Sequence, residues 1–558
     1  MIAYTALLLF LIGIFSGIKV GVKADKLLAY GAFASLFLIF ATFFESVYLP
    51  EEYITSFIWN TSRDRELRFD IISNAYNCGL VFPFFAVTMF MVANNLIFRH
   101  EERRSYYISV VILNLVALIV LITSNNFVQL LAALYFIDIL ALFMIKNAEA
   151  CKRLLLMNIA ADTLLFAVLA MINSRVDSLD IRQILLYRKI GFHVDFIAIC
   201  GLTAVFAKLG FFLFQLGIIG LKKIRFHRLQ TFLFLSSPAA AIILLLKFNT
   251  LWRTSEYFTS YVDGMCLLTM VWGFICSIAI DNFKSKFIYW QMMFWALAVE
   301  LLRYHGFLWD ADFTSLFGGM FLFSNALYML HYYGNRRSEV SQMMRLRLAS
   351  VTGYNAAYLL ILLSVVVLSN TLTAMYNNIN RYSIWIFAVL FVLSISTVVG
   401  QLYFSKAKYR KLNVNRITFK SLHFGVMLAL TVILLRNVQY HEVQVWGFAA
   451  AFMLLCLLSP LHSLSFLYVR EGIQSGDWLG KIYLLQVKSL RLCGKILSFL
   501  VDRMFLENFI MGTLTEISKF GFRLFRHLHS SRLIGGTLVI LIITGLLWLS
   551  FEQGGVNG

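Results

Sequence analysis

A succession of long apolar segments constrains the fold of this chain more than any other feature. About sixteen segments are long enough to cross a bilayer, which takes about 20 apolar residues in a helix. Backbone polar groups find no water inside the hydrocarbon, so each segment is predicted to be an α-helix. The sequence therefore predicts an all-α polytopic membrane protein. The segments lie near residues 2–18, 28–48, 72–97, 105–123, 126–145, 154–173, 193–221, 229–248, 258–280, 287–308, 314–333, 348–370, 383–404, 419–435, 445–469 and 534–551.

The overall composition agrees with this fold class. Of the 558 residues, 60% are hydrophobic and only 14% are charged, whereas soluble domains carry roughly 25% charged residues. The seven cysteines are scattered, without a Cys-x-x-Cys pair or a metal-ligand spacing. There is also no glycine-rich nucleotide loop. We therefore expect this chain to bind no metal and no cofactor of its own.

The basic residues alternate from one connecting loop to the next. Loops after odd-numbered segments carry 25 Lys and Arg residues, and loops after even-numbered segments carry 11. Such an asymmetry marks the inner side of a membrane, so both termini are expected on the outer side. The net charge of +19 then reflects topology, and we expect no nucleic-acid partner.

The segment between the last two apolar stretches has a different pattern. Residues 470–533 carry ten basic residues, with apolar residues recurring at intervals of three and four. This spacing is typical of an amphipathic helix lying along a membrane interface. It predicts a long lateral helix, with a few short interfacial helices or a cytoplasmic domain as alternatives. The apolar positions include Leu484, Leu485, Val487, Leu490, Ile496, Leu497, Leu500, Met504 and Phe505.

Arg303 and Lys420 lie near the ends of their segments and are counted with the loops. Of the other 46 Lys and Arg residues, only Lys208 and Lys247 fall inside predicted spans. Lys247 is near the end of its span, where a long side chain can reach the interface. Lys208 is in the middle of AVFAKLGFFLFQLG, and a central lysine costs about 2.5–3.5 kcal/mol on insertion scales. Such residues mark ion paths in membrane proteins. Lys208 is therefore the first candidate for a proton-carrying group.

Two acidic residues inside spans are the natural partners of Lys208. Asp138 lies in LLAALYFIDILALFMI and Asp162 lies in LLMNIAADTLLF. A carboxylate close to a buried ammonium stabilises its charge, so moving the acid would switch the proton affinity of the lysine. Glu45 and Glu300 lie closer to span ends, which favours interface positions. His305 and His331 also lie near ends, where structural roles are expected.

Two consecutive segments resemble a known family. The stretch at 124–145, SNNFVQLLAALYFIDILALFMI, resembles the fifth span of the antiporter-like subunits of respiratory complex I, and Asp138 falls on the family's glutamate. The stretch at 151–166, CKRLLLMNIAADTLLF, resembles the next span of that family. Asn158 and Asp162 match in register there, whereas the residue after Asn158 is not the family's arginine.

The following segments continue the resemblance. AKLGFFLFQLG resembles the seventh span, so Lys208 falls on the family's proton-carrying lysine. In LSSPAAAIILLLKF (235–248), Lys247 takes the position of an arginine, which the resemblance places on the proton path. A serine, Ser236 or Ser237, stands where the family has a proton-relaying histidine. The resemblance in residue motifs extends from about 124 to 291.

The layout narrows the resemblance to one branch of the family. Sixteen spans with a lateral amphipathic segment before the last span are the layout of chain 5 (subunit L). That family contains two inverted half-channels. The second half-channel is degenerate here, because Asn325 replaces a central lysine and no later span contains a lysine away from its ends. The predicted organisation is an N-terminal group of spans (1–123), a first half-channel (124–260), a second, degenerate half-channel (261–469), the lateral segment (470–533) and a final anchor (534–558).

The resemblance implies a function in energy coupling. The expected role is proton translocation in the membrane arm of an NADH:quinone oxidoreductase, through Lys208, Asp138, Asp162 and Lys247. Electron transfer would take place in other subunits, so the chain is an enzyme only as part of that complex. The expected partners are other membrane-arm subunits and lipid, in a bacterial cytoplasmic or mitochondrial inner membrane. Two alternatives stay open, a non-pumping structural paralogue and a subunit of a multi-subunit cation/proton antiporter.

Overall fold

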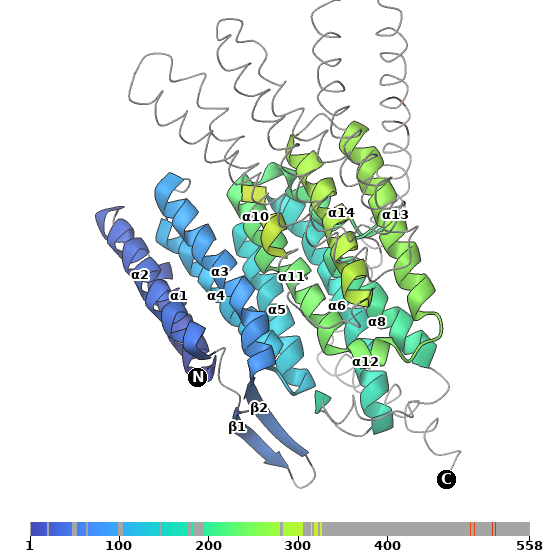
Figure 1. Ribbon diagram of the computed structural model, residues 1–558, viewed down its shortest axis with the longest axis horizontal. Helices are drawn as coiled ribbons and strands as arrows, with labels where there is room; N and C mark the ends of the chain where they lie inside the picture. Colours follow the sequence, from blue (N-terminus) through green and yellow to red (C-terminus); the bar gives the residue numbers. More distant parts are fainter. Residues whose placement is uncertain are drawn as a thin grey trace, which may run out of the picture.

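The computed structural model describes the first 304 residues with short gaps, and a few positions beyond them (Figure 1). In this part of the chain, seven helices are long and apolar enough to cross a membrane. The protein is therefore a multi-pass membrane protein. The described residues are 2–18, 22–46, 53–62, 65–98, 104–145, 147–176, 180–181, 194–279, 283–304, 314, 317–321, 324–325, 492, 496, 516 and 519.

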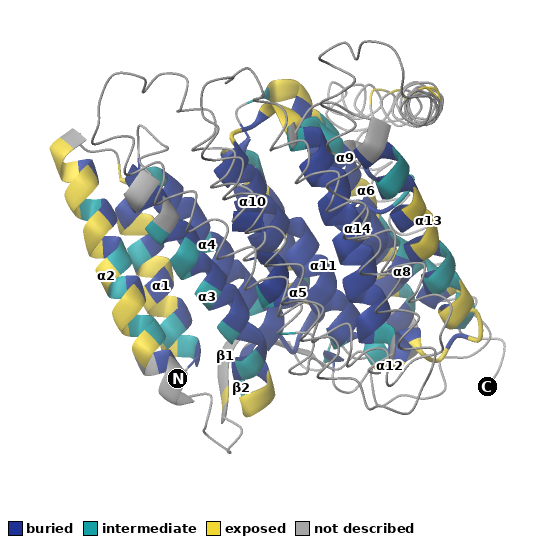
Figure 2. Cartoon of the chain, turned by 45° about the horizontal axis from the view of Figure 1, so that its top comes forward, coloured by how far each residue is buried: buried dark blue, intermediate teal, exposed yellow. Residues whose placement is uncertain are grey.

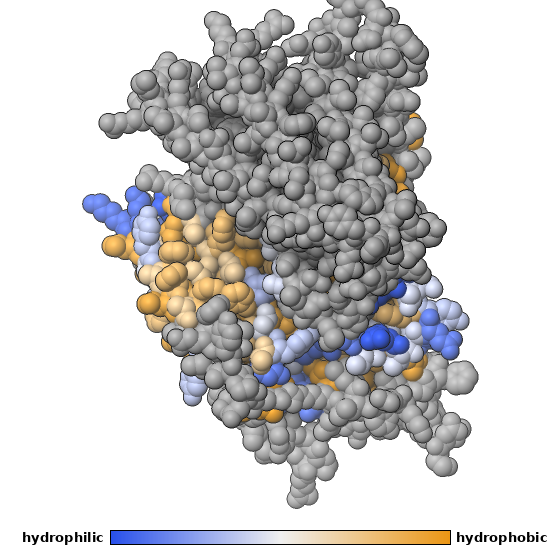
Figure 3. Space-filling view, in the orientation of Figure 1, coloured by the Kyte–Doolittle hydropathy of each residue, from blue (hydrophilic) through white to orange (hydrophobic). Residues whose placement is uncertain are grey.

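The N-terminal helices form one side of the bundle, with α4 at its centre (Figures 1 and 2). α4 is buried along most of its length, whereas α1 and α2 expose an outer face. That face is apolar (Figure 3), as expected for helices that meet hydrocarbon rather than water. The four helices are α1 (Ile2–Gly17), α2 (Val22–Ser46), α3 (Ala75–Phe98) and α4 (Arg104–Thr123).

The start of α4 is capped by a residue from another helix. The carboxylate of Asp25 in α2 accepts hydrogen bonds from the backbone N–H groups of Arg104 at 3.0 Å and Ser105 at 3.3 Å. It also accepts one from the hydroxyl of Ser105. A carboxylate at this end satisfies free N–H groups and complements the positive end of the helix dipole. Asp25 therefore ties α2 to α4.

An antiparallel hairpin, β1 (Tyr53–Ser62) with β2 (Arg65–Ser73), lies between α2 and α3. It corrects the all-α prediction and moves the start of the third span from residue 72 to Ala75. The side chain of Gln129 holds β2 in place, because it exchanges hydrogen bonds with the backbone N–H and C=O of Asp70 at 3.1 and 2.9 Å. Alternating β-branched and aromatic residues in YITSFIWNTS favour a strand.

Two predicted spans are interrupted in the structure. The span at 193–221 divides after α8 (Val194–Leu209) into a turn, the short helix α9 and a 3₁₀ turn. The span at 229–248 divides at Ser236 between α10 and α11. Broken helices occur at membrane depth where they are enclosed by protein. The short elements are α9 (Leu216–Ile219), η1 (Gly220–Lys223), α10 (Phe226–Leu235), α11 (Ser237–Lys247) and α12 (Asn249–Trp252).

The remaining helices enclose these breaks. α10, α11 and α14 form the buried interior, and α5, α6 and α13 flank them, each with one exposed face (Figure 2). Their bounds are α5 (Phe127–Met144), α6 (Ala148–Val176), α13 (Phe258–Ala279) and α14 (Phe283–Tyr304). The predicted count of sixteen spans, most of the second half-channel, nearly all of the lateral segment and the final anchor lie outside the described residues.

Candidate functional site

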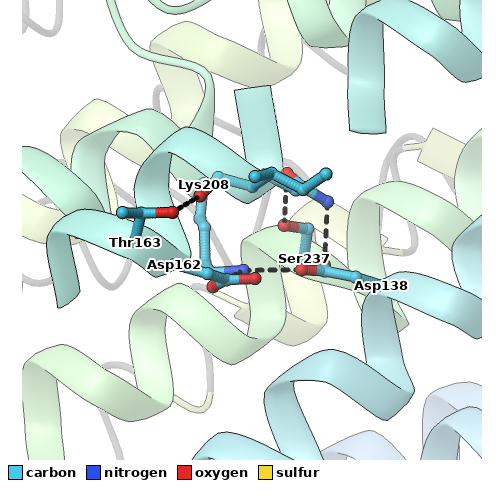
Figure 4. Close-up of polar contacts among 7 residues, drawn as sticks. Asp138, Asp162, Thr163, Lys208 and Ser237 are labelled. Atoms are coloured by element: carbon cyan, nitrogen blue, oxygen red, sulfur yellow. Dashed lines mark hydrogen bonds and ion pairs between the residues drawn. The ribbon is translucent and has the colours of Figure 1, made fainter. Parts of the chain in front are cut away.

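Lys208 lies between the two acidic residues that the sequence predicts as its partners (Figure 4). Its ammonium nitrogen is 2.9 Å from an oxygen of Asp138 in α5 and 2.6 Å from an oxygen of Asp162 in α6. The contact with Asp138 is a hydrogen bond, whereas the contact with Asp162 is an ion pair without hydrogen-bond geometry. The side chains of Lys208, Asp138 and Asp162 are 1%, 8% and 3% exposed. The site is therefore a buried cation shared by two carboxylates.

A short polar chain extends from Asp138. The side-chain amide of Asn158 in α6 donates to the second oxygen of Asp138 at 2.8 Å. The hydroxyl of Ser237 then donates to the amide oxygen of Asn158 at 3.4 Å, and Figure 4 places Ser237 beside this group. Asn158 and Ser237 are both buried. These contacts join α5, α6 and α8 to the first residue of α11.

The break after α8 places Lys208 at a helix end. Lys208 is the residue before Leu209, where α8 ends, and Gly210 follows with φ at 70°. The backbone N–H of Phe212 in the turn donates to the hydroxyl of Thr269 in α13 at 3.0 Å. Positive φ costs little at glycine and favours this residue at a helix terminus. The C-terminal carbonyls of α8 carry partial negative charge, which adds to the field that holds the ammonium.

The charges at the site do not balance when all three groups are ionised. Two carboxylates and one ammonium then give a net charge of −1, and an uncompensated charge is costly in a buried, low-dielectric position. Binding one proton on either carboxylate brings the net charge to zero. The arrangement can therefore hold an exchangeable proton while the cation stays paired, which is the chemistry that proton transfer requires.

Lys247, the fourth predicted site residue, is the last residue of α11, and its side chain reaches the C-terminal end of α4. Its ammonium donates to the carbonyl oxygens of Leu121 at 2.8 Å and Ile122 at 3.1 Å, and to the hydroxyl of Ser124 at 2.7 Å. These carbonyls belong to the last turn of α4, where no intrahelical N–H reaches them. The contacts favour a capping role for Lys247, and its predicted place on the proton path remains untested.

Another ionic group was not predicted. Glu300 is 2% exposed, and it pairs with Arg303 three residues later in α14. Its expected position near a membrane interface stays a prediction. Arg303 also pairs with Asp263 of α13. The spacing of Glu300 and Arg303 gives a local signal for the first pair, but the sequence contains no signal for the second.

Asn325, in the predicted position of a lost lysine, is buried and donates to the carbonyl of Phe321 at 2.8 Å.

Comparisons with solved structures give matches over most of the chain. A chain of the Mrp complex from Dietzia sp. DQ12-45-1b has a TM-score of 0.61 and 14% identity. The match covers 99% of this chain and 63% of the Dietzia chain. A chain of respiratory complex I from Thermus thermophilus with bound NADH has a TM-score of 0.58 and 14% identity over 82% of this chain and 100% of its own length. This chain shares their fold.

A third match agrees with these two. A chain of the membrane-bound sulfane sulfur reductase, an archaeal respiratory membrane complex, has a TM-score of 0.58 and 11% identity. That match covers 83% of this chain and 98% of the other. The resemblance to complex I antiporter-like subunits is thereby confirmed for the fold. No family profile matches the sequence, and no curated protein matches it.

Proposed function

We propose that this chain translocates protons in the membrane arm of an NADH:quinone oxidoreductase, and that Lys208, Asp138 and Asp162 carry the proton. The observation that supports this most directly is the buried ammonium with two carboxylates within 2.9 Å. A purely structural cation needs only one acid to balance its charge, whereas a group with one acid in excess can also bind a proton. The fold shared with membrane complexes agrees with this role.

The separation between Lys208 and the acids would control the proton. In an effective dielectric of 20, two unit charges attract each other by about 6 kcal/mol at 2.9 Å and by about 2 kcal/mol at 7 Å. A movement of a few ångströms at the break after α8 would therefore change the proton affinity of Lys208 by more than about a hundredfold. When the pair is closed, Lys208 holds its proton. When the pair opens, Lys208 releases that proton along the path.

The neighbouring residues would keep the carboxylates in place during this cycle. Asn158 donates to Asp138 at 2.8 Å, so the carboxylate keeps one partner when the ammonium moves away. Ser237, at the N-terminus of α11, links Asn158 to the positive end of that helix. In this proposal, electron transfer and quinone reduction take place in partner subunits. The partners would also include the neighbouring membrane-arm subunits.

A second candidate function is supported by the extent of one match. The Mrp complex chain aligns with 99% of this chain, against 82% for the complex I chain. A subunit of a multi-subunit cation/proton antiporter would use the same charged group, with exchange of a cation in place of redox coupling. The two functions differ in their partners. Purification in mild detergent with quinone- and NADH-oxidising subunits supports complex I, and purification without them supports the antiporter.

The test of the proton-carrying role is Lys208→Ala in the assembled complex. Proton yield per electron should fall, because removal of the ammonium eliminates the group that exchanges the proton. Lys223→Ala is a suitable control, because Lys223 also pairs with a carboxylate, that of Glu149, but its side chain is 50% exposed. A wild-type proton yield in Lys208→Ala would identify the chain as a structural, non-pumping subunit.

A further inference from the structure

The ion pairs between α13 and α14 form a second charged group inside the bundle. Arg303 lies 2.7 Å from an oxygen of Asp263 and 2.9 Å from an oxygen of Glu300. The side chains of Glu300 and Arg303 are 3% and 11% exposed, whereas that of Asp263 is 45% exposed. The group therefore extends from the interior of the bundle to its surface.

The charge balance of this group matches that of the Lys208 site. Among the described residues, two carboxylates pair with Arg303, so these three groups have a net charge of −1 when all are ionised. An arginine remains charged under all conditions in proteins, which leaves the carboxylates as the groups that can bind or release a proton. A buried acid in a membrane helix is costly and indicates a functional site. Glu300 is such a buried acid. Asp263, whose side chain is partly exposed, connects the Glu300–Arg303 pair to the surface of the bundle.

One helix connects the two charged groups. α13 contacts the break beside Lys208 through Thr269, which accepts from the backbone N–H of Phe212 at 3.0 Å. The hydroxyl of Tyr261 in α13 also lies 2.7 Å from that of Thr203 in α8. Asp263 comes six residues before Thr269, which is about 9 Å along the helix axis at 1.5 Å per residue. The second group therefore lies between the level of the break and the start of α13.

We propose that Glu300, Arg303 and Asp263 form a second proton-exchange site, through which the path from Lys208 reaches water at the end of the bundle where α13 begins. A proton on the carboxyl group of Glu300 passes to the carboxylate of Asp263 and from there to bulk water, or follows the reverse route. Arg303 keeps its charge and stabilises whichever carboxylate is ionised. This site rests on the proposed function of Lys208, and it supplies titratable groups beside a half-channel that has Asn325 in place of a lysine.

The test is Glu300→Gln in the assembled complex, measured as proton translocation in vesicles. The amide keeps the size of the side chain but cannot exchange a proton, so translocation should fall about tenfold or more. Glu300→Asp retains the carboxyl group and should restore a substantial part of the rate, which a purely structural requirement for shape would not predict. Glu149→Gln is the matched control, because Glu149 also pairs with an arginine but its side chain is 56% exposed.

Asp263→Asn provides a second measurement that does not disturb a buried position. It should lower translocation in complexes that assemble in wild-type amounts, even where Glu300→Gln prevents assembly. Wild-type translocation in either assembled variant would overturn the second site. If Glu300→Gln and Asp263→Asn are unimpaired while Lys208→Ala is inactive, only the second site fails. If Lys208→Ala is also unimpaired, the proposed function fails with it.

Discussion

Lys247→Met should distinguish between a capping role for this lysine and a place on the proton path. Methionine keeps the length and the apolar stem of the side chain but lacks the ammonium. The variant loses the donor to the carbonyls of Leu121 and Ile122 and to the hydroxyl of Ser124. A hydrogen bond to a charged group contributes about 1.5–3 kcal/mol, and a cation at a helix C-terminus adds about 0.3–1 kcal/mol.

The expected cost follows from these contacts. Leu121 keeps a second donor, because the hydroxyl of Ser124 donates to its carbonyl at 2.9 Å. The carbonyl of Ile122 loses the donor that Lys247 supplies, and the attraction to the helix end disappears. We therefore expect a destabilisation of about 2–3 kcal/mol. Lys247→Arg, which keeps the charge and several donors, should retain most of the stability.

Two assays on the same purified complexes measure this. Thermal unfolding in detergent, followed by tryptophan fluorescence, should show a clearly lower midpoint for Lys247→Met than for the wild type. Proton yield per electron, normalised to assembled complex, should remain at the wild-type level. An unchanged midpoint with lost proton translocation would refute the capping role and place Lys247 on the proton path, as the family resemblance implies.

Two further predictions concern the stability that residues at helix ends contribute. Gly210→Ala should destabilise the chain by about 1–2 kcal/mol, because φ is 70° and an added Cβ would collide with Ile218. The control is Gly31→Ala, which lies in open space within α2 and should not destabilise the chain. Equal thermal midpoints for the two variants would contradict this prediction. Asp25→Ala should lower stability by about 0.5–2 kcal/mol through loss of the cap on α4. The same unfolding assay measures both, and an unchanged midpoint in Asp25→Ala would show that solvent or another group replaces the cap.

The closeness of Lys208 to Asp138 and Asp162 could be predicted because charged groups inside apolar segments need partners. Only a few such residues occur in the chain, so the choice of partner was narrow. The positions of α1, α4, α5 and α13 can also be predicted from the sequence, because continuous apolar runs of spanning length have few alternatives to a helix. Their predicted bounds agree with the structure to within one or two residues.

The breaks in two helices were missed because their signals are short. Gly210 and the Ser236–Pro238 stretch are local marks of a break, but the long apolar runs around them suggested uninterrupted spans. The sequence gives a weak signal for the hairpin, because its alternating residues lie between two apolar spans, where a connecting loop is expected. The contact of Lys247 with α4 and that of Arg303 with Asp263 depend on tertiary packing, which a single sequence does not encode locally.

The central claim is that Lys208 and Asp138 act as one unit in proton transfer, and a double-mutant cycle measures this most directly. Proton translocation by assembled complexes is compared for Lys208→Ala, Asp138→Asn and the double variant. Residues that act as a unit show strongly non-additive losses. We predict that the double variant loses no more activity than the more severe single variant. Losses that multiply would show that the two residues contribute independently and would contradict the account.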